Sequence, residues 1–167
     1  MELGTPATFA ATWLTMMAAM MLPGTAPAVA RAASATGRAL TVPLFAGSYL
    51  AIWAAVGLLV YAVYAPHGAP TTGLVALAAG FYELTPLKRA CRERCRTAVP
   101  SGAQFGIYCV GSSIGLMAIL VAVDVMSVAW CVVIGAVITA QKLLPPRIWI
   151  DIPVALAIAA LGVASLT

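Results

Sequence analysis

Residues 106–144 read GIYCVGSSIGLMAILVAVDVMSVAWCVVIGAVITAQKLL, and Asp124 and Lys142 are the only charged residues in these 39 positions. As a helix rising 1.5 Å per residue, the stretch would be about 58 Å long, roughly twice the thickness of a bilayer's hydrocarbon core. Asp124 and Ser127 provide a polar break near its middle. We therefore predict two membrane spans joined by a tight hairpin at Asp124–Ser127.

Four further apolar runs have about the length that crosses a bilayer, roughly 17–25 residues. They extend from about Pro6 to Leu22, from Ala39 to Tyr64, from Thr72 to Leu87 and from Ile148 to Leu166. The first is expected to stop at Pro23-Gly24, because proline and glycine break helices. Together the runs predict an all-α fold, a polytopic transmembrane helical bundle of about six helices that forms one domain over residues 1–167.

The composition supports lipid as the surrounding solvent. Apolar residues make up 63% of the chain, charged residues only 8%, and the mean hydropathy is +1.02. A soluble domain has about a quarter of its residues charged, enough to cover its surface. The net charge of +4 does not indicate nucleic-acid binding, because the basic residues form short clusters between apolar runs. The expected partner is the lipid bilayer.

The basic residues also predict the orientation. With six spans, all nine Lys and Arg fall in loops on one side, which the positive-inside rule assigns to the cytoplasm. They are Arg31 and Arg38; Lys88, Arg89, Arg92, Arg94 and Arg96; Lys142 and Arg147. Both termini are then outside, and a bacterial-type plasma (inner) membrane is the expected location. Ala28-Val29-Ala30 resembles a signal cleavage site, but the preceding residues contain Glu2 and no Lys or Arg, unlike a signal peptide.

Sulfur-bearing side chains are the candidates for chemistry in the first span. Met16 with Met20, and Met17 with Met21, are spaced four residues apart, so each pair shares a helix face. Thioethers are soft ligands that suit Cu(I). The alternative is that these methionines are flexible apolar filler of a helix interface.

Cysteines near the third and fourth spans extend this set. If the segment is helical, Glu83, Leu87, Cys91 and Cys95 share one stripe, and the neighbouring Arg and Lys are expected to favour the thiolate. Cys109 can join them if spans three and four are neighbours, and we expect spans one, three and four to pack together at their inner ends. Cys131 is expected to be too distant and inert. The alternative is a basic membrane-surface helix with incidental cysteines.

No catalytic arrangement is visible, so we do not expect an enzyme. His67 is the only histidine and falls in an outer loop. No nucleophile stands with a base in a recognisable pattern. Metal capture and transfer need no such pattern, because ligands simply exchange.

The sequence resembles the metal-binding integral membrane proteins grouped as domain of unknown function 2182, some of them described as copper chaperones. The most specific part is Thr85-Pro86-Leu87-Lys88, Cys91 and Cys95-Arg96, and the resemblance covers about residues 10–146. Further matching positions are Trp13, Met16 to Met21, Pro23, Tyr82, Gly106, Tyr108-Cys109, Gly111, Met117, Met126, Trp130 and Lys142-Leu143. This chain has Ser112 and Ser113 where the family usually has cysteines. It also has Phe105 and Gln141 where histidine and glutamate are common.

The resemblance implies Cu(I) capture and hand-over on the cytoplasmic side, to a copper-receiving protein or to subunits of a membrane complex. The proposed ligands are Met16, Met17, Met20, Met21, Cys91, Cys95 and Cys109. One alternative is a non-catalytic structural or assembly subunit of a larger membrane complex. Others are a membrane thiol oxidoreductase using the three cysteines and a transporter of small solutes.

Overall fold

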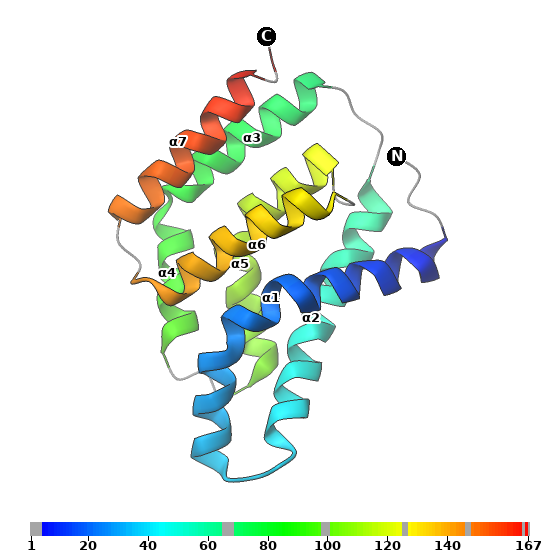
Figure 1. Cartoon of the computed structure of the whole chain (residues 1–167), viewed down its shortest axis with the longest axis vertical. Coiled ribbons are helices and arrows are strands. Elements are labelled where there is room, and N and C mark those ends of the chain that lie inside the picture. Colours follow the sequence, from blue (N-terminus) through cyan, green and yellow to red (C-terminus); the bar gives the residue numbers. More distant parts are fainter. Residues whose placement is uncertain are drawn as a thin grey trace.

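The computed structural model describes residues 5–64, 69–97, 101–124, 127–145, 148–164 and 166. The described residues contain seven helices, so the all-α prediction is confirmed (Figure 1). They are α1 (Pro6–Thr36), α2 (Thr41–Val63), α3 (Ala69–Glu83), α4 (Pro86–Arg96), α5 (Gly102–Asp124), α6 (Val128–Leu143) and α7 (Ile148–Ala164). The long apolar stretch is divided where predicted, because α5 ends at Asp124 and α6 begins after Ser127. His67 and Arg147 lie outside the described residues.

The first helix is longer than its sequence predicts. Thr5 caps its start, and α1 continues through Pro23 and Pro27 to Thr36 before Gly37 ends it in the left-handed conformation at φ 63°. The expected stop at Pro23-Gly24 is therefore wrong. A proline inside a helix removes one backbone hydrogen bond and bends the helix without necessarily ending it. Figure 1 shows this bend, with the second half of α1 and the start of α2 forming a helical hairpin at one end of the molecule.

The third apolar run ends earlier than predicted. It stops at Glu83, and α4 begins at Pro86, where the Thr85 hydroxyl accepts a hydrogen bond from the Lys88 backbone N–H. Threonine at the N-cap followed by proline in the first turn is a strong helix-start pattern. The expected stripe through Glu83, Leu87 and the cysteines is therefore wrong, since Glu83 is on a different helix and Leu87 is 61% exposed.

Helix α5 is the centre of the packing. It lies against α2, α3, α4 and α6, while α3 pairs with α7, and α1 packs mainly on α2 and α6. Small residues allow close approach: a Cβ on Gly73 of α3 would lie 2.9 Å from the Gly162 carbonyl oxygen of α7. The expected grouping of spans one, three and four holds for α3 and α5. Helix α1 packs mainly on α2 and α6, and it meets α5 at a cavity that Gly24, Pro27 and Ala28 share with Phe105.

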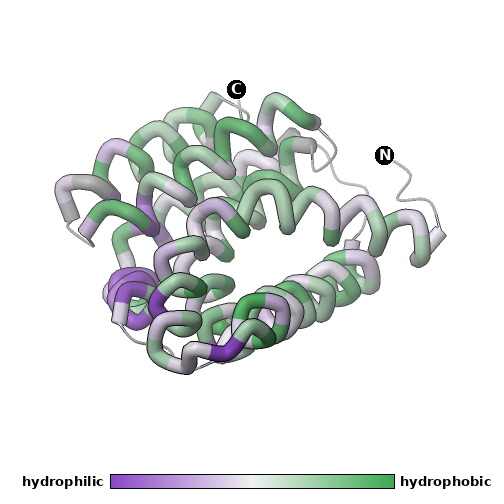
Figure 2. The backbone as a smooth tube through the Cα atoms, turned by 60° about the horizontal axis from the view of Figure 1, so that its bottom comes forward, coloured by the Kyte–Doolittle hydropathy of each residue, from purple (hydrophilic) through white to green (hydrophobic). Residues whose placement is uncertain are grey.

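Polar residues gather at one end of the molecule. Figure 2 shows the strongest hydrophilic colour on α4 and near the turn between α1 and α2, whereas the other helices are mostly hydrophobic. Large apolar side chains such as Leu44, Phe81 and Trp149 are 68%, 77% and 80% exposed. Three of the described helices, Pro6–Thr36, Thr41–Val63 and Gly102–Val123, are long and apolar enough to cross a membrane.

Candidate functional site

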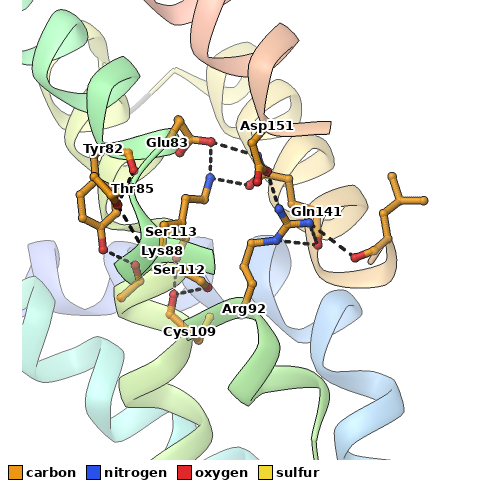
Figure 3. A network of polar contacts seen from close by, with 12 residues as sticks. Tyr82, Glu83, Thr85, Lys88, Arg92, Cys109, Ser112, Ser113, Gln141 and Asp151 are labelled. Atoms are coloured by element: carbon orange, nitrogen blue, oxygen red, sulfur yellow. Dashed lines mark hydrogen bonds and ion pairs between the residues drawn. The ribbon is translucent and has the colours of Figure 1, made fainter. Parts of the chain in front are cut away.

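A buried polar network joins four helices at the end of the molecule that carries α4 (Figure 3). Its first part is an ion pair between Lys88 of α4 and Glu83 of α3, both fully buried. Gln141 of α6 bridges the pair: Lys88 Nζ donates to Gln141 Oε1 at 3.0 Å, and Gln141 Nε2 donates to Glu83 Oε2 at 3.0 Å. Burial lowers the pKa of Lys88, and the Glu83 charge opposes this shift.

The second part of the network ties α4 to α7. Arg92 forms a buried ion pair with Asp151 and also donates from Nε and Nη2 to the Gln141 carbonyl oxygen, at 3.1 and 2.6 Å. Glu83 Oε1 and Asp151 Oδ2 are buried, and neither has a hydrogen-bond partner within the described part of the chain. Sequence reasoning missed this network, although single acids within apolar runs were a signal for it. It could not show that Arg92 and Asp151, 59 positions apart, would meet.

The cysteines of α4 face α5. Cys91 is half-buried over Gly111, where a Cβ would come within 2.7 Å of its Sγ atom. Cys95, one turn further, is buried. Burial raises the pKa of Cys91, against an opposing effect of Arg94, and burial together with the nearby Cys109 raises the pKa of Cys95 to about 12. The expectation that nearby basic residues would make these cysteines thiolates is wrong, because desolvation is the larger effect.

Cys109 of α5 is fully buried and close enough to Cys95 to act on it electrostatically. Its Sγ atom is 3.3 Å from the Tyr49 hydroxyl of α2. Ser112 and Ser113 donate their hydroxyls to the Cys109 backbone carbonyl at 2.9 and 2.7 Å (Figure 3). Both hydroxyls therefore make hydrogen bonds to the α5 backbone.

The methionines of α1 divide into two pairs. Met17 and Met21 are fully buried, and the Met21 sulfur lies 3.8 Å from Lys142 Nζ of α6. Met16 and Met20 instead line a groove between α1 and α6 together with Cys131. The proposed ligands thus do not converge on one point, and Cys131 is half-buried beside Met16 rather than remote from every methionine.

We call Met21, Cys95 and Cys109 the inner sulfur cluster, because Lys142 contacts Met21 and acts on Cys95, and Cys95 is close to Cys109. Besides its contact with Met21, the Lys142 ammonium lies 5.9 Å from the ring centroids of both Tyr49 and Phe105 and acts on Cys95 electrostatically. A cavity of about 220 Å³ reaches this region. It is lined by Gly24, Pro27, Ala28, Arg31, Cys95, Arg96, Phe105, Lys142 and Leu143. Among the described residues, no three His, Cys, Asp or Glu side chains are grouped to hold a metal ion.

Comparison with known proteins identifies the family. The family model PpoB2, described as copper chaperone, matches residues 10–165, which include both the polar network and the inner sulfur cluster. No curated protein and no solved structure matches the chain. The match covers nearly the whole chain, so this protein belongs to the PpoB2 copper chaperone family.

Proposed function

We propose that this chain is an integral membrane protein that captures Cu(I) in the inner sulfur cluster and passes it on by ligand exchange, without catalysis. The observation that carries the proposal is that Lys142 lies beside the Met21 sulfur and acts on Cys95, which in turn is close to Cys109. Cys95 and Lys142 also line the cavity. Two thiols and a thioether form a soft donor set, which suits a soft monovalent ion. A closed tetrahedral zinc site would need a fourth Cys or His ligand.

Charge balance supports the same ion. When Cu(I) binds, the Cys95 and Cys109 thiols release their protons to water, and the dithiolate complex has net charge −1, to which Met21 adds no charge. A buried charge needs a partner, and the Lys142 ammonium lies beside the cluster to supply it. We assign Lys142 the role of counter-ion, which moves from Met21 as the metal takes its place.

The surroundings support exchange on the cytoplasmic side. Arg31 and Arg96 line the cavity beside Cys95, and the basic helix α4 lies at the same end. The positive-inside rule assigns such an end to the cytoplasm. A basic rim favours docking of an acceptor with an acidic surface, so Cys95 would deliver the ion to a copper-receiving protein.

A Cu(I) competition titration with a chelator tests this proposal on the purified full-length protein under reducing conditions. Cys95→Ser should lower the affinity by more than about tenfold, equivalent to about 1.4 kcal/mol, and Met21→Leu should lower it less. Met117→Leu is the matched control, because Met117 is a buried α5 methionine outside the cluster. Equal affinities in all four proteins would disprove Cu(I) binding at the cluster.

A structural or assembly role is the second candidate. It is favoured by the hydroxyls of Ser112 and Ser113, which bond to the α5 backbone beside the cluster and offer no soft ligand. If the titration finds no Cu(I), the protein should instead co-purify with a membrane complex. That complex should lose stability when the chain is deleted.

A further inference from the structure

The groove between α1 and α6 holds a second group of sulfur atoms. Cys131, in the first turn of α6, donates its thiol hydrogen to the Met16 sulfur of α1 at 3.3 Å. Met20 lies one turn along the same face of α1, where its Cγ atom is 3.4 Å from the Cβ position of Gly135. All three side chains line the groove, whose volume is about 1000 Å³.

The spacing of these atoms suits a shared ion. Metal–sulfur bonds are about 2.3 Å long, so two of them can join one ion to sulfurs 3.3 Å apart at a bent angle. Met20 is placed to supply a third soft ligand from the same helix face. The absence of a side chain on Gly135 leaves room for Met20 to approach α6.

The electrostatics of the groove favour a monovalent ion. Its lining is neutral and mostly small, including Ala19, Ala136 and Thr139. One thiolate with one monovalent cation is neutral overall and needs no counter-ion in apolar surroundings, whereas a divalent cation would leave an unpaired positive charge. The inner sulfur cluster obeys the same requirement for neutrality. Its two thiolates and one monovalent cation carry a net charge of −1, which the neighbouring ammonium balances.

We infer that Met16, Met20 and Cys131 form a second site for a soft monovalent metal ion, separate from the inner sulfur cluster. Along α6, Cys131 and Lys142 are eleven residues apart, about 16 Å of helix. When the ion binds, the Cys131 thiol releases its proton to water and its sulfur bonds to the metal, with no change of oxidation state. The use of this site for copper rests on the proposed function, whereas the site itself rests on the groove.

Titration with Ag(I), a soft monovalent ion that is stable in air, tests the inference on the full-length protein in detergent. We expect two equivalents bound by the wild type, one by Cys131→Ser and one by Cys95→Ser. Met16→Leu should weaken the groove site by about tenfold, or about 1.4 kcal/mol. Met117→Leu, a buried methionine change away from both sites, should behave as the wild type.

The two proposals can fail separately in this experiment. If Cys95→Ser loses one equivalent and Cys131→Ser loses none, the inner cluster stands and the groove site is disproved. Loss only in Cys131→Ser supports the groove site and refutes the cluster. As an independent measurement, Ag(I) should protect Cys131 from alkylation by N-ethylmaleimide in a variant with the other three cysteines changed to serine. Unchanged alkylation in a folded variant would also disprove the groove site.

Discussion

The positive charge of Lys142 is expected to strengthen Cu(I) binding. If it balances the charge of Cu(I) held by two thiolates, Lys142→Gln should weaken Cu(I) binding by about tenfold, since removing a nearby opposite charge costs on the order of 1 kcal/mol or more. Lys142→Arg keeps the charge and should retain most of the affinity. A chelator titration of both variants measures this. Stronger binding by Lys142→Gln would show instead that the ammonium blocks the site.

Gly111 is a second residue with a testable local role. A Cβ at this position would lie 2.7 Å from Cys91 Sγ, so alanine should force α4 away from α5. We expect Gly111→Ala to destabilise the protein by about 1–3 kcal/mol, the usual cost of overpacking. Thermal unfolding in detergent measures the change.

The controls for Gly111 use the same kind of substitution. At Gly47 of α2, a Cβ would meet nothing within 4 Å, so Gly47→Ala should be neutral or stabilising, as expected for alanine in a helix. Adding Cys91→Ala to Gly111→Ala should restore stability. Failure of that double variant to recover would mean that Gly111 matters for a reason other than contact with Cys91.

At the scale of elements, the ion pair of Glu83 and Lys88 connects two helices that are separate only because of the break at Thr85. Lys88→Met should destabilise the protein by about 3–5 kcal/mol, because it leaves a buried carboxylate without its cation. Adding Glu83→Gln removes that charge, so the double variant should be more stable than Lys88→Met alone. A double-mutant cycle by chemical unfolding in detergent measures the coupling.

The surface of the same helix offers the control for this cycle. Glu93 is an exposed residue of α4, and Glu93→Gln should change stability by less than about 0.5 kcal/mol. If the effects of Lys88→Met and Glu83→Gln simply add, the buried pair does not hold α3 to α4. Such a result would mean that the ion pair of Arg92 with Asp151 is the one that holds α4 in place.

For the whole molecule, the distribution of basic residues predicts an orientation that labelling can measure. In a variant without native cysteines, His67→Cys should react with an impermeant maleimide in intact cells. Arg38→Cys should react only after the membrane is opened, because its loop is expected to face the cytoplasm. The reverse pattern would contradict the six-span arrangement with both termini outside.

Much of the architecture could be predicted because it depends on composition along the chain. The division between α5 and α6 follows from a polar break in a long apolar run, and the polar end follows from clustered basic residues. The continuation of α1 beyond Pro23 could not be predicted, because a proline can bend a helix without ending it and the packing of α1 on α2 and α6 is not visible in the sequence.

The candidate site was less predictable, because it depends on which helices become neighbours. Sequence spacing identified Met16 with Met20 and Met17 with Met21 as pairs. It could not show that α6 would bring Cys131 to Met16 and Lys142 to Met21. Sequence spacing also did not reveal the break at Thr85. Because of this break, the residues of the expected stripe lie on two helices, which a buried ion pair joins.

The pairing of Arg92 with Asp151 has a consequence for biosynthesis. Arg92 is synthesised 59 residues before Asp151, so α4 leaves the ribosome long before α7 can neutralise its guanidinium. Until then Arg92 is best accommodated in water or among lipid headgroups, because an unpaired charge is costly in an apolar interior. We therefore expect α4 to take its final position late, when the last helix arrives. Chains truncated before Ile148 should expose α4 to proteases even when the earlier helices are already inserted.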